Sequence, residues 1–169
     1  GGYFMELGGW ERAHGYAANE HLLEKYGDRV PVRENEWDNR HFWPVSNAEH
    51  LAMSEDCGIV NLSHFHMVDV EGPDHVALLE WLCAARIGGD ANIGKGIYTH
   101  FLDDEGMVRA DFTVFRLADR CRLVNGADAG PRDFHYMKRV AQDRGLDVTI
   151  TDTSEKYITI GIWGPNARD

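Results

Sequence analysis

A single carboxylate, Asp111, interrupts the second of two strand-like runs within residues 95–117. Burying an unpaired charge in an otherwise apolar strand costs several kcal/mol, so an isolated acid at such a position needs a reason. A carboxylate set among aromatic residues can hold the N–H group of a flat heterocycle and accept or relay its proton. Asp111 is therefore the first candidate for chemistry in this chain.

The residues around Asp111 predict a β-hairpin with a tight acidic turn. Pairing Leu102 with Met107 across a four-residue loop places Tyr98 opposite Asp111. Directly opposed residues share a sheet face, with Cβ atoms about 5 Å apart. We therefore expect Tyr98, Asp111 and Phe115 on one face. The other face should be core, formed by Val108, Ala110, Phe112 and Val114. A merely solvated Asp111 on an exposed face is an equally open interpretation, because a one-residue register error inverts the face.

Three other patterns are weaker candidates. Asn125 ends a short strand before a helix, where it can cap or turn the chain or present its amide to a ligand. His64 and His66 share one strand face, but no further ligand is fixed beside them, so no metal site is predicted. Residues 89–95 resemble a phosphate-binding loop, yet Gly96 stands where Ser or Thr is required and a strand follows, which predicts an ordinary loop.

Composition limits the classes of function. The chain has 169 residues, 43% of them apolar, enough for one compact domain with a core. Its net charge of −11 argues against a nucleic-acid partner. No apolar run approaches the roughly 20 residues of a membrane span, and no signal peptide is visible, so no membrane partner is expected. The three cysteines show no Cys-x-x-Cys spacing, which favours a cytoplasmic location. Nothing indicates an oligomeric state.

The elements that must position Asp111 predict an α+β class with a largely antiparallel sheet and flanking helices. Residues 1–45 look irregular apart from a short helix at 19–27, and are interpreted as a linker or wrapping arm following an absent upstream domain. Residues 46–169 form the second predicted part. Its helices are expected from the Ser46–Glu49 capping box to Gly58, from Pro73, and from Pro131 to Gly145. Its other strands are expected at 59–62, 65–70 and 122–125, with a closing pair at 148–151 and 157–163.

Residues 46–169 resemble the first half of the folate-binding aminomethyltransferase domain of the glycine-cleavage T-protein family. The matching pieces occur in family order: CGIVNLS at 57–63, VEGPD at 70–74, GIYT at 96–99, DEG at 104–106, AD at 110–111, LVN at 123–125 and WGP at 163–165. The order and spacing of these pieces carry the resemblance, since no single piece is specific. Asn61 replaces an Asp that is common in the family.

The element GWER at residues 9–12 is similar to the dimethylglycine and sarcosine dehydrogenase type of this family. In those proteins an FAD-dependent amine oxidoreductase precedes the folate domain. This chain has no Gly-x-Gly-x-x-Gly fingerprint, so FAD would be bound by an upstream domain that is absent here.

The resemblance implies roles for individual residues. It assigns Asp111 as the catalytic carboxylate, and Tyr98, Phe115 and Asn125 as residues that bind the tetrahydrofolate cofactor. Phe115 stands where some relatives have Tyr, so a hydroxyl contact is lost while stacking persists. The anionic tail of folate needs cations, and we expect them from strand-borne arginines: Arg116, Arg120 and Arg122.

The implied function is one-carbon transfer from an N-methyl amine to tetrahydrofolate, giving 5,10-methylenetetrahydrofolate. Two alternatives stay open: a stand-alone aminomethyltransferase or folate-dependent demethylase, and a non-catalytic folate-binding module. Further pterin-binding residues of the family lie beyond Asp169, so the chain is expected to hold only part of a folate site.

Overall fold

The computed structural model describes residues 1–37, 43–126 and 129–169, and it divides the chain into two units. The N-terminal unit consists of residues 1–60 and 160–169, and the sheet unit consists of residues 61–159. Part of the predicted wrapping arm, residues 38–42, lies outside the described residues. Within the described residues, no helix is both long and apolar enough to cross a membrane.

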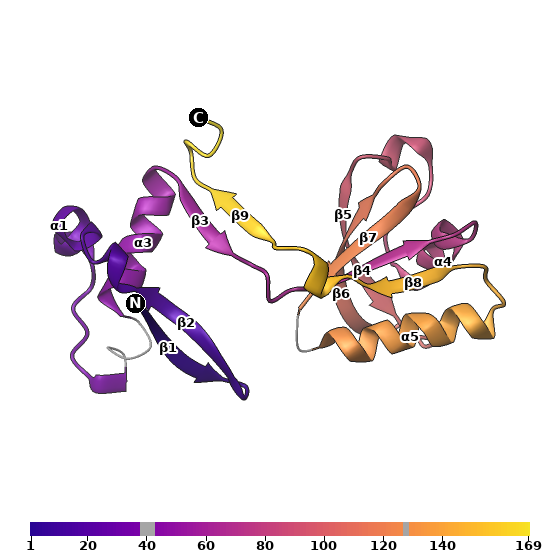
Figure 1. Ribbon diagram of the computed structural model, residues 1–169, viewed down its shortest axis with the longest axis horizontal. Helices are drawn as coiled ribbons and strands as arrows, with labels where there is room; N and C mark the ends of the chain where they lie inside the picture. Colours follow the sequence, from indigo (N-terminus) through magenta and orange to yellow (C-terminus); the bar gives the residue numbers. More distant parts are fainter. Residues whose placement is uncertain (38–42, 127–128) are drawn as a thin grey trace. The chain divides into compact units, whose positions relative to one another are not determined.

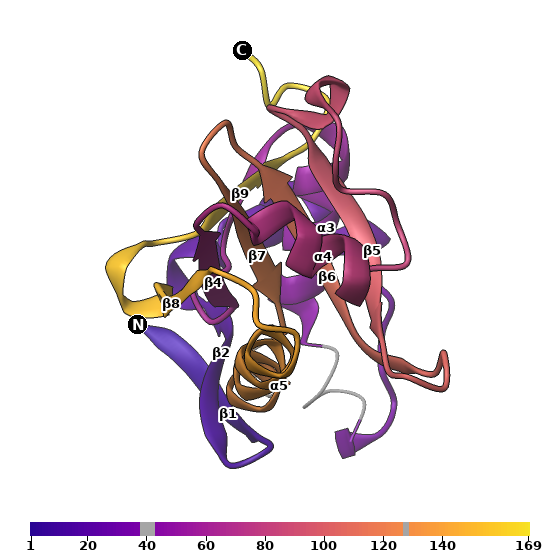
Figure 2. The same cartoon turned by 90° about the vertical axis from the view of Figure 1, so that its right-hand side faces the viewer.

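The sheet unit is built on five antiparallel strands in the order β5-β6-β7-β4-β8. The strands are β4 (His66–Glu71), β5 (Gly96–Leu102), β6 (Val108–Arg116), β7 (Arg120–Asn125) and β8 (Thr149–Asp152). Two helices, α4 (His75–Leu82) and α5 (Gly130–Asp143), lie on the same side of this sheet (Figure 2). The predicted α+β class with a largely antiparallel sheet is confirmed.

The core lies between this sheet and the two helices. Phe112 on β6 stacks on Phe101 of β5 with ring centroids 4.0 Å apart, and both are fully buried. Val114 and Ala110 join this core as predicted. The prediction for Val108 is wrong, because its side chain is 64% exposed. An extra residue, Arg109, bulges out of β6 between the Phe101–Ala110 and Leu102–Val108 pairs, so Val108 leaves the alternation that the strand otherwise keeps.

The sequence patterns predicted most of the helices and strands, but several predicted boundaries and one predicted strand pairing differ from the structure. Helix α4 begins at His75, and Pro73 lies in the preceding turn rather than at the first helical position. The helix expected from Pro131 is confirmed as α5, which begins one residue earlier at Gly130. The predicted closing pair is wrong, because β8 pairs with β4, while β9 (Ile160–Trp163) pairs with β3 (Gly58–Asn61) in a separate two-stranded ribbon.

The N-terminal unit contains a hairpin that contradicts the expected irregular start (Figure 1). Gly8 and Gly9 join its strands and both have positive φ, as a tight two-residue hairpin turn requires. The capping box predicted at Ser46 is also wrong, since the helix begins at Pro44 and the Ser46 hydroxyl donates to the carbonyl of His14. The elements of this unit, besides the ribbon, are β1 (Gly2–Leu7), β2 (Trp10–Tyr16), α1 (Leu22–Tyr26) and α3 (Pro44–Glu55).

Candidate functional site

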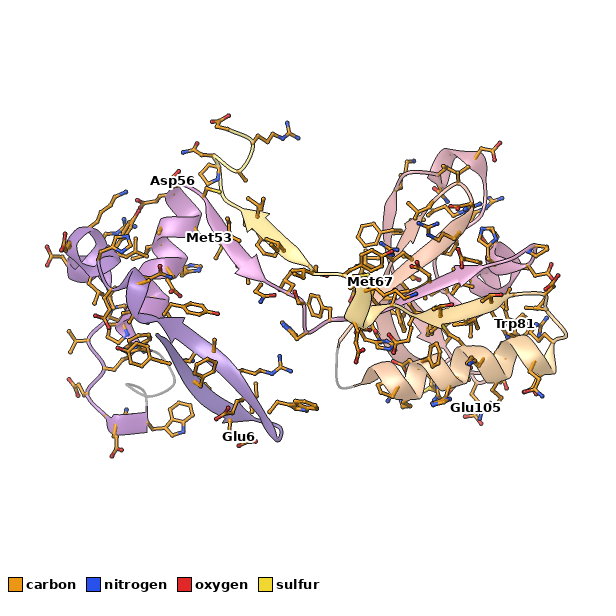
Figure 3. The ribbon with its side chains drawn as sticks, in the orientation of Figure 1. Glu6, Met53, Asp56, Met67, Trp81 and Glu105 are labelled. Atoms are coloured by element: carbon orange, nitrogen blue, oxygen red, sulfur yellow. The ribbon has the colours of Figure 1, made fainter. Side chains whose placement is uncertain are left out.

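The sheet unit has an outer face, defined here as the side of the five-stranded sheet opposite α4 and α5. Strand alternation and register place one row of side chains straight across this face, from β5 through β6 and β7 to β4: Tyr98, Thr113, Val124 and Met67. Figure 3 labels Met67, which lies at the start of β4. The candidate site lies on the β5–β6 hairpin, at one edge of this outer face.

Asp111 lies on this outer face, but its cross-strand partner is His100 rather than Tyr98. The predicted register is wrong by two residues. One residue comes from a longer loop, in which Leu102 pairs with Val108, and one comes from the bulge in β6. A shift of two residues preserves the face, because side chains alternate with a period of two.

Tyr98 and Asp111 nevertheless meet, as diagonal neighbours. The Tyr98 hydroxyl donates a hydrogen bond to Asp111 Oδ2 at 3.2 Å. The negative charge of Asp111 raises the pKa of Tyr98, and burial and this hydrogen bond act in the same direction. The phenol therefore stays protonated and can keep donating to the carboxylate. Asp111 itself is exposed, so its carboxylate can accept a hydrogen bond from a ligand.

Two exposed aromatic rings lie on the same side of this carboxylate along the strand direction, Tyr98 at the next outer-face pair (Tyr98–Thr113) and Phe115 at the one after it (Gly96–Phe115). Tyr98 is 63% exposed and Phe115 is 43% exposed. Phe115 pairs with Gly96, where an added Cβ would lie 3.1 Å from the Phe115 ring. Glycine at this position lets the ring lie close over β5. The outer face thus offers an acid at one end of a row that continues with two exposed rings, which suits a flat heterocycle with an N–H group.

An ion pair adjoins Phe115 on the same face. Arg122, the cross-strand partner of Phe115, holds Asp69 through two hydrogen bonds of 2.7 and 2.8 Å. These bonds raise the pKa of Arg122, whose guanidinium also lies 4.2 Å from the centroid of the Tyr157 ring. Arg120 approaches the same carboxylate at 3.6 Å. The Arg122 side chain therefore serves first to neutralise the carboxylate of Asp69, which is buried.

The chain matches known proteins over its whole length. The GCVT N-terminal domain is matched by residues 1–169. The chain belongs to the GCVT N-terminal domain family. It is 34% identical over 152 residues to an aminomethyltransferase of Bordetella bronchiseptica, a match covering 89% of this chain and 40% of that protein.

Two further matches frame this assignment. A 4-methylaminobutanoate oxidase (formaldehyde-forming) of Paenarthrobacter nicotinovorans is 29% identical over 170 residues, which cover 100% of this chain and 19% of the oxidase. The glycine cleavage system aminomethyltransferase T of Bartonella henselae has the same fold, with a TM-score of 0.71 at 23% identity, covering 99% of this chain and 38% of that one. This GCVT N-terminal domain thus spans about two fifths of the length of its aminomethyltransferase relatives.

Asn125 is not brought together with the other three predicted residues of this GCVT N-terminal domain. Its side chain lies on the helix side of the sheet, is 6% exposed, and donates to Asp133 Oδ2 on α5 at 3.2 Å. Strand alternation places the side chain of Val124 on the outer face instead.

The arginines expected to bind the anionic tail are not all on the outer face either. The Arg116 side chain is buried and donates to the carbonyls of Leu117 and Arg120.

Sequence reasoning missed His100, which the register places beside Asp111. Its position two residues after Tyr98 in the same strand was the available signal. His66 lies on the helix side and its Nε2 is 3.1 Å from Asp152 Oδ2. Across residues 1–37, 43–126 and 129–169, no group of three or more His, Cys, Asp or Glu side chains could hold a metal ion. The loop at 89–95 leads into strand β5, as expected.

Proposed function

We propose that this domain takes part in tetrahydrofolate-dependent one-carbon transfer, with the outer face of the β5–β6 hairpin as one wall of the folate site. The observation that carries the proposal is the exposed Asp111 carboxylate, oriented by the Tyr98 hydroxyl and followed along the outer face by the exposed rings of Tyr98 and Phe115. Family membership supports the same reaction class, since the curated relatives include aminomethyltransferases. This chain covers 40% of one such relative, and we expect the remaining walls outside the part that it covers.

The donor set of this wall fits a reduced pterin. Tetrahydrofolate, when bound, supplies the amine nitrogen to which the carbon is transferred. Asp111 accepts a hydrogen bond from that amine and takes or relays its proton as the C–N bond forms, a contribution of about 10²–10⁴-fold. Tyr98 holds the carboxylate in place, and Phe115 stacks against the ring. Asn125 stays a prediction as a cofactor-binding residue.

We further propose that the one-carbon donor is an N-methyl amine of the dimethylglycine or sarcosine type, oxidised by an FAD-dependent domain upstream of Gly1. The full-length similarity to an oxidase named for 4-methylaminobutanoate supports this arrangement. Without such a domain, the alternative is a stand-alone aminomethyltransferase or a folate-dependent demethylase. The open reading frame upstream of Gly1 distinguishes the two. The domain boundary at residue 46, the small-molecule partners and the cytoplasmic location stay predictions.

The test is Asp111→Asn in the full-length protein, with tetrahydrofolate-dependent methylene transfer measured separately from amine oxidation. Asp104→Asn is the matched control, since Asp104 is an exposed carboxylate in the turn of the same hairpin. We expect transfer to fall by about 10²–10⁴-fold in Asp111→Asn and to stay unchanged in Asp104→Asn. Equal transfer rates in the two variants would refute the role of Asp111. Wild-type protein that binds tetrahydrofolate without transferring carbon would instead indicate a non-catalytic folate-binding module.

A further inference from the structure

Two guanidinium groups pack against one tyrosine ring where α5 meets the turn end of the β5–β6 hairpin. Arg109 of β6 and Arg139 of α5 have their Cζ atoms 4.1 and 5.2 Å from the centroid of the Tyr136 ring. The Tyr136 hydroxyl donates to the carbonyl of Leu102 on β5, which holds the ring against the hairpin. The ring is only 8% exposed, so it supports the two cations and is not itself a surface for a ligand. We call these three residues the Arg109–Tyr136–Arg139 cluster.

The bulge in β6 brings a cation to a helix that already carries cations. Tyr136 and Arg139 are three residues apart on α5, and Arg132 lies one turn before Tyr136, so the three share a helix face. Arg109 is the bulged residue, and a bulge redirects a side chain that strict alternation would place elsewhere. Arg132 donates to the Arg109 carbonyl at 2.9 Å, which ties the bulge to the helix.

The protein does not neutralise the cations of this cluster. Within the part of the chain that the structure describes, no carboxylate forms an ion pair with Arg109 or Arg139, whereas Arg132 is paired with Asp133. The hairpin turn beside Arg109 is acidic, but its Asp103 carboxylate is held by two backbone amides. Guanidinium groups bind carboxylates through paired N–H groups. On a chain with a net charge of −11, the cluster therefore offers an anion two cations that have no internal carboxylate partner.

The order of side chains on the outer face gives the direction in which a folate tail leaves the site. Asp111 is nearest the hairpin turn, Tyr98 is further from it, and Phe115 is furthest. In tetrahydrofolate, the amine that receives the carbon is bonded to the ring carbon that carries the aminobenzoylglutamate tail. A pterin that covers the two rings with this amine at Asp111 therefore directs its tail toward the turn. Arg109 lies two residues from Asp111 in that direction, about 6–7 Å along the strand.

We infer that the Arg109–Tyr136–Arg139 cluster binds the glutamate carboxylates of tetrahydrofolate at the turn end of the hairpin. This inference rests on the function proposed above. The strand arginines expected for this role are buried or paired with the carboxylate of Asp69, so the cluster supplies cations that they cannot. The contacts are made by side chains, and the amides of α5 keep their hydrogen bonds within the helix.

A pair of ligands separates the charge of the tail from the rest of the molecule. The diamide of tetrahydrofolate, in which both glutamate carboxylates are primary amides, keeps the pterin and the length of the tail but has no negative charge. We would titrate the full-length protein anaerobically with each ligand by calorimetry. The wild type should bind tetrahydrofolate at least tenfold more tightly than the diamide, the affinity equivalent of a hydrogen bond between charged groups.

The variants Arg109→Gln and Arg139→Gln should each weaken the binding of tetrahydrofolate about tenfold and leave the binding of the diamide unchanged. Arg144→Gln is the matched control, because it removes the same charge from an arginine that stacks on Trp81, 3.4 Å from the ring centroid, at the C-terminal end of α5. It should bind both ligands like the wild type. Circular dichroism during thermal unfolding checks that each variant is folded, and Arg139→Gln alone decides if Arg109→Gln is not, since Arg139 is exposed.

Two results would overturn the inference on the cluster: tetrahydrofolate binding at wild-type strength in both arginine variants, or an equal loss for tetrahydrofolate and its diamide. The proposed function fails separately. If the wild type binds neither ligand, or if Asp111→Asn transfers carbon like the wild type, the folate site is wrong and the inference fails with it. If Asp111→Asn is impaired while the arginine variants bind both ligands normally, only the inference on the cluster is wrong.

Discussion

The two faces of the five-stranded sheet both carry polar clusters, but the clusters differ in what their side chains are bound to. On the outer face, Asp111 accepts a hydrogen bond from the Tyr98 hydroxyl and is exposed to solvent. On the helix side, Asp133 is almost fully buried and is held by Asn125 and Arg132. Buried polar groups need internal partners, whereas exposed ones can exchange water for a ligand. The helix-side cluster therefore stabilises the fold, and the outer cluster is free to bind.

The comparison is sharpest between two phenylalanines on the same strand. Phe112→Ala removes a fully buried ring stacked on Phe101, and should lower the free energy of unfolding by about 3–5 kcal/mol. Phe115→Ala should change that free energy by only about 0.5 kcal/mol, because the ring is partly exposed. Urea unfolding of the full-length protein measures both.

Phe115→Ala should instead weaken tetrahydrofolate binding about threefold to tenfold, the affinity equivalent of one aromatic contact. Titration by tryptophan fluorescence measures the dissociation constant. An unchanged dissociation constant for tetrahydrofolate, together with a large loss of stability, would contradict the assignment of Phe115 to a binding face.

A smaller effect is expected where α5 meets the sheet. An added Cβ at Gly130 would lie 2.3 Å from His66 Cγ and 2.7 Å from His66 Cβ. Gly130→Ala should therefore lower the free energy of unfolding by about 1–3 kcal/mol through overpacking. Adding His66→Ala removes the contacts with the ring and leaves only the one with Cβ, so the double variant should lose less than the sum of the single variants in urea unfolding. Strict additivity would mean that the two residues do not compete for this space.

Removing the hydroxyl of Tyr98 tests whether its hydrogen bond orients the Asp111 carboxylate on the outer face. Tyr98→Phe removes the hydrogen bond to Asp111 and leaves the ring. We expect folate-dependent transfer to slow about fivefold, the equivalent of about 1 kcal/mol, with stability unchanged. Transfer at the wild-type rate would show that the hydroxyl does not orient the carboxylate. A lowered unfolding temperature would show that it is structural.

The smallest effect concerns the pH dependence of the contact between Asp152 and His66, also on the helix side. Burial alone would raise the pKa of Asp152, but hydrogen bonds from Ser154 and from His66 outweigh it and hold the pKa below its ordinary value. A lowered pKa contributes stability above the unfolded value of about 3.9, and this stability is lost as pH falls through the folded value. Asp152→Asn should therefore flatten the fall in unfolding temperature below about pH 4. An identical acid limb in the variant would exclude this linkage.

The sequence predicted correctly that Tyr98, Asp111 and Phe115 share one face of the hairpin, but it predicted the wrong register. Alternation has a period of two, so Tyr98, Asp111 and Phe115 stay together under a two-residue shift. The bulge at Arg109 and the longer loop have no signature in residue type, and they moved His100 into the place expected for Tyr98. The fold class followed from local periodicity. The separation of β8 from β9 depends on long-range pairing, which local patterns do not encode.

The placement of Asn125 shows that a shift of one residue, unlike a shift of two, moves a side chain to the other face of the sheet. One position along a strand decides the face, so a resemblance in sequence does not by itself fix the side of the sheet on which the Asn125 side chain lies. Asn125 pairs with His66 on the helix side, while its neighbour Val124 faces outward. Gly8 and Gly9 could have revealed the N-terminal hairpin, but the flanking residues lack the alternation that marks strands.

Hydrogen–deuterium exchange of the full-length protein, with and without tetrahydrofolate, tests the central claim most directly. If the outer face of the β5–β6 hairpin is a wall of the folate site, binding should slow amide exchange in peptides covering residues 96–116 at short labelling times. Peptides covering α5, on the other side of the sheet, should exchange as before. Protection of α5 without protection of the hairpin would contradict the account.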